Sequence, residues 1–189
     1  MAVLSLTLLT GCSDPVADDF ENYLNVEMKE INADYKKLTQ EVGAWENSED
    51  DADILVSIEE ILLPIVNDSL AALEDIKPET DEVKAIKEKY VKVMETYKAA
   101  FETFTDAINT QDEDTAIAAA EKLSEAVELL DEYNASLEKL AKELLENGEL
   151  SVQAVATSVG YGDYNYFCKD FKRNFGISAK EYRIGCNIK

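Results

Sequence analysis

Apolar residues recur at steps of three and four in four successive stretches of the chain. In the first stretch, from Leu24 to Trp45, the apolar positions are separated by 4, 3, 4, 3, 4 and 3 residues, which is heptad spacing. The same spacing returns between Asp53 and Ile76, between Pro78 and Ile108, and between Asp112 and Leu144. Because such steps keep apolar side chains on one side of a helix, the pattern predicts four long helices.

The segments between these stretches are short and polar, namely "ENSEDDAD", "DIKPET" and "NTQDED", and no part of the body alternates with the period of a strand. The fold class that follows is all-α, with a long up-and-down helical bundle and no sheet. Pro64 removes a backbone donor and predicts a kink in the second helix. Pro78 is expected in the first turn of the third helix, and the cluster Asp112-Glu113-Asp114 at the start of the fourth.

Two of the predicted interior stripes are specific enough to be tested position by position. In the second helix the stripe consists of Leu55, Ile58, Leu62, Ile65, Leu70 and Leu73. In the fourth helix it consists of Ile117, Ala120, Leu123, Val127, Leu130, Leu137, Leu140 and Leu144. The aromatic residues at helical spacing in the third helix are expected in the same core.

Two shorter helices are predicted after Asn147-Gly148, a dipeptide that is typical of a helix C-terminus. Ser151 can cap the first of these helices, and Gly160 can supply the turn that follows it. Asp163 can cap the second, which carries the basic residues. The apolar faces of the two helices are Val152, Val155, Ala156 and Val159, and Phe167, Phe171 and Phe175. Two short helices joined by a tight glycine turn form the helix-turn-helix pattern.

The tail agrees with a helix-turn-helix in its particular residues as well as in the spacing of its apolar positions. The segment "LAKELLENGELSVQAVATSVGYGDYNYFCKDFKRNFGISAKEYR", from Leu140 to Arg183, resembles the second helix-turn-helix of AraC/XylS-family transcription regulators. The resemblance includes Val159-Gly160-Tyr161 in the turn and Phe175-Gly176 with Glu181-Tyr182-Arg183 near the end. The departures are Ala179, where the family usually has proline, and Cys168, where a small polar residue is commoner.

The resemblance implies which residues meet DNA. In that family the second helix lies in the major groove, so Tyr164, Asn165 and Lys169 are the candidates that face base edges. Asparagine can pair with adenine through two hydrogen bonds, and lysine can donate to guanine. Lys172 and Arg173 are expected to hold phosphates, which adds affinity without sequence information.

Charge is divided unevenly along the chain. The whole sequence has 40 acidic and 18 basic residues, for a formal charge of -22. Residues 1–140 hold 34 acids and 11 bases, whereas residues 141–189 hold 6 acids and 7 bases. The family's DNA-binding unit is about twice the length of this tail and contains two helix-turn-helix halves, yet an acidic bundle precedes this one. Because the bundle repels phosphates, DNA binding is expected to be weak unless the chain forms an oligomer, such as a homodimer.

The composition argues against catalysis and metal binding. Histidine, the commonest general base and metal ligand, does not occur in the sequence. The acidic clusters lack the glycine and closing glutamate of an EF-hand. We therefore expect no enzyme activity, no catalytic residue, no metal and no cofactor.

The beginning of the chain suggests a location at a membrane, whereas a DNA-binding tail implies the cytoplasm. Leu9-Thr10-Gly11-Cys12 resembles the lipobox of bacterial lipoproteins, which would make Cys12 the site of lipidation and membrane anchoring. However, no basic residue precedes Lys29, whereas a secretory signal starts with positive charge. No apolar run approaches the length of a membrane span.

These observations lead to two hypotheses about function and to a predicted division of the chain into three units. In the first, the protein is a cytoplasmic DNA-binding regulator, or a remnant of one, whose bundle serves for oligomerisation or sensing. In the second, it is an extracytoplasmic lipoprotein anchored at a membrane surface, with the bundle as a non-catalytic interaction module. A third possibility is that the chain joins two unrelated segments. The predicted units are residues 1–19, a signal-like segment and tether, residues 20–140, the bundle, and residues 141–189, the helix-turn-helix half-domain.

Overall fold

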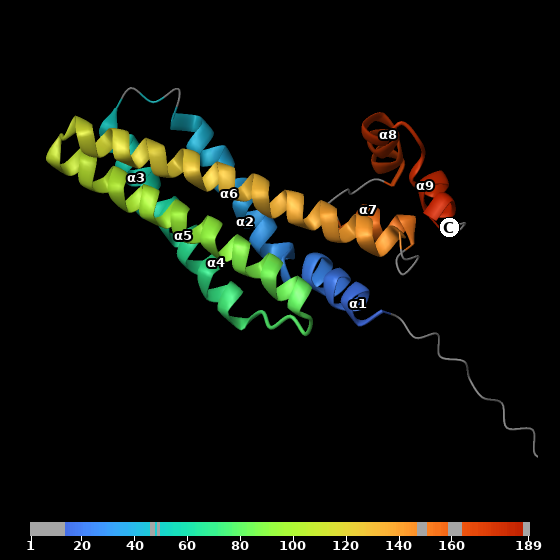
Figure 1. Ribbon diagram of the computed structural model, residues 1–189. Coiled ribbons are helices and arrows are strands. Elements are labelled where there is room, and N and C mark those ends of the chain that lie inside the picture. Colours follow the sequence, from blue (N-terminus) through green and yellow to red (C-terminus); the bar gives the residue numbers. More distant parts are fainter. Residues whose placement is uncertain (1–13, 46–47, 49, 147–150, 159–163, 187–189) are drawn as a thin grey trace, which may run out of the picture.

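The computed structural model describes residues 14–45, 48, 50–146, 151–158 and 164–186. Within these ranges the elements are helical and no strand occurs, so the all-α prediction is confirmed. Long helices lie side by side in an elongated bundle, and three short C-terminal helices gather at one end of it (Figure 1). None of the helices in these ranges combines the length and the apolar content needed to cross a bilayer.

The first two predicted helices are each interrupted by a π-helical turn. The first consists of α1 (Pro15–Asn22), the π turn η1 (Tyr23–Glu27) and α2 (Lys29–Ala44), so it starts before the predicted Leu24 and includes residues 15–19, which were predicted to belong to a tether. The second consists of α3 (Asp51–Ser57), the π turn η3 (Ile58–Leu62) and α4 (Leu63–Asp75). The third and fourth are the long helices α5 (Asp81–Thr110) and α6 (Glu113–Glu146).

The turn η3 ends two residues before Pro64, where the sequence predicts a kink. Proline cannot donate to the preceding turn, and a π-helical turn relieves the resulting crowding. The extra residue of this turn also shifts the helix face that follows. Val66 and Ser69 are buried, whereas the predicted positions Ile65 and Leu70 are only half-buried.

The predicted start of the third helix at Pro78 is wrong. The helix α5 begins at Asp81, and Thr80 at its N-cap has an extended backbone. The two residues before it are held by Asp19 in α1, a buried carboxylate. It accepts hydrogen bonds from the Glu79 N–H (3.1 Å), the Thr80 N–H (2.8 Å) and the Thr80 hydroxyl (2.6 Å). These bonds hold residues 79 and 80 out of the helix, so that Pro78 lies in the connection.

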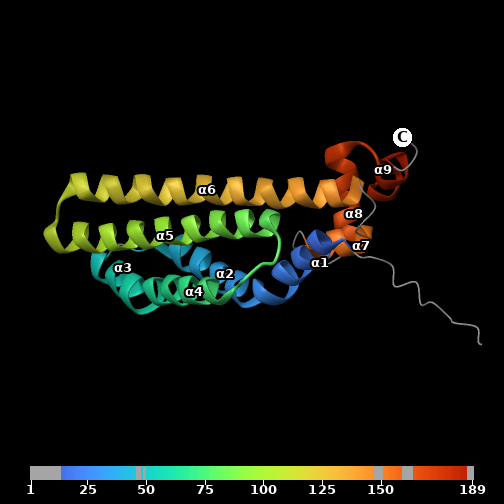
Figure 2. The same cartoon turned by 60° about the horizontal axis from the view of Figure 1, so that its bottom comes forward.

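The predicted interior stripe is also wrong in the N-terminal half of α6. Ile117 and Val127 are about half exposed, at 53% and 48%, and Ala120 is exposed too. Ala119 and Ala126 are fully buried instead. Figure 2 gives the reason, because α6 lies on α5, which separates it from α4. Small residues allow the two long helices to approach closely, and larger apolar residues are left outside.

Aromatic rings fill the space between α2 and α5. The ring centroid of Trp45 lies 6.0 Å from that of Phe101 and 5.5 Å from that of Phe104. The Trp45 indole N–H donates to Ser57 Oγ (3.0 Å), and the hydroxyls of Tyr35 and Tyr97 are 3.3 Å apart. The aromatic residues at helical spacing therefore belong to the core, as predicted.

Candidate nucleic-acid interface

The tail consists of α7 (Val152–Ser158), α8 (Tyr164–Phe175) and α9 (Ala179–Cys186), which follow the end of α6 (Figure 2). The described residues of its predicted apolar faces are buried, and they join the buried end of α6 in one cluster: Leu140, Ala141, Leu144, Val152, Val155, Ala156, Phe167 and Phe171. The predicted Val159, Gly160 and Asp163, together with the side chain of Phe175, lie outside the described residues.

The connection from α8 to α9 is fixed by local chemistry. Gly176 has φ +77°, which side chains disfavour, and its N–H donates to the Lys172 carbonyl (2.9 Å). Ser178 and Glu181 then form a capping box. The Ser178 N–H and hydroxyl donate to the Glu181 carboxylate, and the Glu181 N–H donates to Ser178 Oγ. The bonds from Ser178 lower the pKa of Glu181.

Ala179, one of the two departures from the family pattern, is the fully buried first residue of α9. Proline is favoured at a first helical position because its missing N–H has no partner in the helix there. Alanine fits the same position, so this departure leaves the local structure intact.

Contacts on two sides hold the tail against the bundle. The Tyr182 hydroxyl of α9 donates to the carboxylate of Glu146 at the end of α6, and its ring packs edge-on against Phe171, with centroids 5.6 Å apart. On the other side, α7 contacts α1 and η1. The helix-turn-helix therefore packs onto the end of the bundle through α7 and α9, and α8 packs on those two helices.

One face of α8 is exposed and polar. Asn165, Lys169, Lys172 and Arg173 are all exposed, at spacings of four, three and one, while Phe167 and Phe171 are buried on the opposite side. These four predicted contact residues are thus brought together on a single surface. Lys172 and Arg173 lie in the last turn of α8, where the helix dipole favours positive charge.

Tyr164, the remaining candidate on this helix, lies on a different side of it. At about 100° per residue, Tyr164 is about 140° around the helix from Lys169, whereas Tyr166 is only about 60° away. Tyr164 also neighbours Cys168, which raises the pKa of the tyrosine through a side-chain hydrogen bond. Tyr166 is 61% exposed and was missed by the sequence reasoning, although its helical position relative to the buried phenylalanines could have indicated it.

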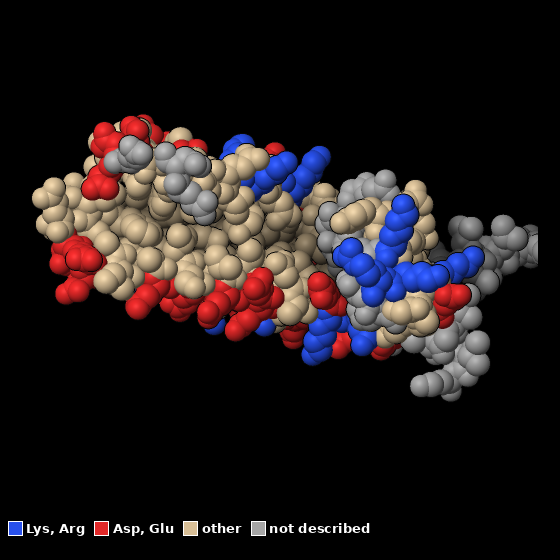
Figure 3. Space-filling model, turned by 90° about the horizontal axis from the view of Figure 1, so that it is seen from above, with Lys and Arg blue, Asp and Glu red and all other residues tan. Residues whose placement is uncertain are grey.

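The charge on the molecule divides between its two ends in the same way as along the chain. Figure 3 shows basic side chains gathered over the helix-turn-helix and acidic side chains along the edges of the bundle. Lys180, exposed on α9, adds to the basic residues of α8. The tail can therefore attract a polyanion, while the bundle repels it.

Among the described residues, no three His, Cys, Asp or Glu side chains are grouped so that they could hold a metal ion. The predicted lipidation site, Cys12, lies outside the described residues. What the tail offers is hydrogen-bonding groups and positive charge on a rigid surface.

Comparison with known proteins supports this description of the tail. Residues 132–184 match the family model described as a helix-turn-helix domain. The match starts inside α6 and includes α7, α8 and most of α9. It supports the resemblance of the tail to AraC-type regulators, and with it DNA binding in general. No curated protein and no solved structure matches the chain.

Proposed function

We propose that the protein is a cytoplasmic, non-enzymatic transcription regulator that binds DNA through a single AraC-type helix-turn-helix. The observation that carries the proposal is the exposed face of α8, where Asn165, Lys169, Lys172 and Arg173 lie together on the part of the chain that matches a helix-turn-helix domain. The acidic bundle serves for oligomerisation or sensing. We place the boundary between bundle and half-domain inside α6, between Leu140 and Ala141.

The dimensions of α8 suit the major groove. The groove is about 12 Å wide and admits an α-helix. The 12 residues of α8 span about 18 Å, which is the length of helix that can lie in it. Asn165 and Lys169, near the start and middle of the helix, are assigned to base edges, with Tyr164 at the margin of that surface. Lys172 and Arg173, at the end of the helix, are assigned to phosphates.

Charge makes binding by one copy weak. A single helix-turn-helix half offers only about three to five phosphate contacts, and each contact is opposed by the field of the bundle. Two copies in a dimer would double the number of contacts. Ile117 and Val127, exposed on α6, provide apolar surface for contact between copies.

The experiment is a titration of random duplex DNA by fluorescence anisotropy, from 50 to 200 mM salt, with wild type, Lys172→Ala and Arg173→Ala. Each variant should weaken binding at every salt concentration and reduce the slope of log K against log salt by about one. The matched control is Lys36→Ala, which removes an exposed lysine from α2. The proposal fails if wild type does not bind at 50 mM salt, or if Lys36→Ala weakens binding as much as Lys172→Ala.

The alternative function is that of a lipoprotein anchored outside the cytoplasm, and its support is the sequence Leu9-Thr10-Gly11-Cys12 together with the acidity of the bundle. The two functions exclude each other, because a chain anchored outside the membrane cannot reach the chromosome. Mass spectrometry of the N-terminus of the expressed protein distinguishes them. A diacylglyceryl group on Cys12 would overturn the regulator, and an intact Met1 would overturn the lipoprotein.

A further inference from the structure

A pocket of about 550 Å³ beside the connection between α4 and α5 gathers basic side chains on an otherwise acidic body. Residues 1–140 contain 11 bases against 34 acids, and four of those bases, Lys77, Lys84, Lys87 and Lys92, line this pocket. The volume lies within the range of about 300 to 1,000 Å³ that is usual for small-molecule sites.

Hydrogen bonds to backbone carbonyls position three of these lysines. Lys87 donates to the Ile76 carbonyl (2.7 Å), Lys84 donates to the Glu79 carbonyl (3.0 Å), and Lys77 donates to the Glu74 carbonyl. An ammonium group has three N–H donors. Lys87 and Lys77 therefore keep further donors for a ligand, and Lys84 keeps one beyond its additional bond to Asp81 (3.2 Å).

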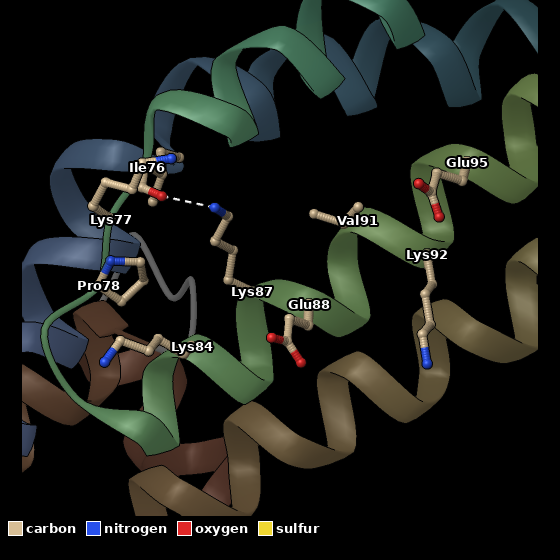
Figure 4. A pocket seen from close by; sticks show the side chains of 9 residues that line it. All are labelled: Ile76, Lys77, Pro78, Lys84, Lys87, Glu88, Val91, Lys92 and Glu95. Carbon is tan, nitrogen blue, oxygen red and sulfur yellow. Dashed lines mark hydrogen bonds between the residues drawn. The ribbon is translucent and has the colours of Figure 1, made fainter.

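Apolar side chains form part of the same pocket. Ile76 and Pro78 are buried in the connection, and Val91 is half-buried on α5. Figure 4 shows the Lys87 side chain reaching from α5 to the Ile76 carbonyl, with Val91 one turn further along the helix and Lys84 beside Pro78. The pocket thus places ammonium groups next to an apolar wall.

The surrounding charges limit how negative a ligand can be. Glu88 and Glu95 also line the pocket, and Lys84 is already paired with Asp81. Lys92 points from α5 toward α6 in Figure 4, so it contributes its charge from a distance. Partial burial and the neighbouring Lys77 lower the pKa of Lys87, whereas Glu27, Glu88 and Glu74 oppose that shift. A ligand with one negative charge would reduce the repulsion between the ammonium groups of Lys77 and Lys87. A ligand with more negative charges would be repelled by Glu88 and Glu95.

We propose that this pocket binds a small organic acid with a single carboxylate, held between Lys77 and Lys87, and with an apolar portion against Ile76, Pro78 and Val91. This site is independent of the helix-turn-helix, and its occupation requires no DNA. In a regulator, a pocket of this kind on the bundle would be the place where a metabolite is sensed.

The test is isothermal titration of the full chain with three probes: hexanoate, hexanol and inorganic phosphate. Hexanoate should bind saturably. Hexanol lacks the charge and phosphate lacks the apolar portion, so each should bind at least about ten-fold more weakly. The absence of saturable hexanoate binding, or equal binding of hexanol, would overturn the proposal.

Matched variants locate the site. Lys87→Gln and Lys77→Gln should each weaken hexanoate binding about ten-fold, because each removes a charge-assisted hydrogen bond. Lys98→Gln makes the same charge change elsewhere on α5 and should alter the affinity by less than about two-fold at 0.15 M salt. Circular dichroism checks the fold, and Lys77→Gln, at an exposed residue, keeps the test valid if Lys87→Gln unfolds. Equal weakening by Lys98→Gln would show that the attraction is not confined to the pocket.

Discussion

Asp19 offers the sharpest test of how the bundle is held together. Its buried carboxylate, in α1, binds two backbone N–H groups and one hydroxyl at residues 79 and 80, about 60 positions later in the chain. It therefore ties α1 to the connection that precedes α5. Because α1 also contacts α7, the same carboxylate supports the surface on which the helix-turn-helix rests.

The loss of unfolding free energy expected on removal of this carboxylate can be worked out from its hydrogen bonds. A hydrogen bond to a charged group contributes about 1.5–3 kcal/mol. The three bonds share one carboxylate, so their contributions do not add in full. Asp19→Ala should therefore lower the free energy of unfolding by about 2–4 kcal/mol. Asp19→Asn keeps one acceptor oxygen and should cost about half as much.

Urea unfolding at pH 7, followed by circular dichroism at 222 nm, measures this free energy. The control is Asp68→Ala, which removes an exposed carboxylate from α4 and should change stability by less than about 0.5 kcal/mol. If Asp19→Ala costs less than about 1 kcal/mol, or no more than Asp68→Ala, then the bonds from Asp19 do not hold the connection before α5 in place.

Two further predictions concern the packing of the long helices and the buried tyrosines. Ala126→Leu should lower the free energy of unfolding by about 1–3 kcal/mol, because Ala126 is fully buried in α6, whereas Val127→Leu at the half-exposed neighbour should be close to neutral. Equal effects in urea unfolding would contradict the helix face described above. Burial raises the pKa values of Tyr23, Tyr90 and Tyr97, so the native state keeps protons that the unfolded chain releases near pH 10. Stability should therefore fall as pH rises above 10, by about 1.4 kcal/mol per tyrosine at pH 11, and Tyr90→Phe should reduce that fall in urea titrations at pH 9 and 11.

Features that depend on neighbouring residues in the chain were predictable. The four long helices follow from steps of three and four between apolar residues, and the structure has helices in all four stretches. Asp112 caps α6 as its position suggested, since the Thr115 N–H donates to its carboxylate (3.3 Å). The buried face of the tail, including Val155 and Phe167, follows from the same periodicity.

Features that depend on which elements meet in space were not predictable. The stripe in the N-terminal half of α6 was misplaced because apolar spacing does not say that α5 requires a close approach through Ala119 and Ala126. The start of α5 was misplaced because residues 79 and 80 are held by Asp19, which lies in another helix.

The sequence by itself determined that this protein is helical, that its body is acidic and its tail basic, and that the tail resembles a DNA-binding half-domain. These properties are local, since they depend on residue type and on spacing within one helix. Only the tertiary structure decided which face of α6 is buried, what holds the residues before α5, and that Lys77, Lys84 and Lys87 line one pocket. Those outcomes depend on contacts between residues far apart in the chain, and one helix's periodicity does not specify its partner.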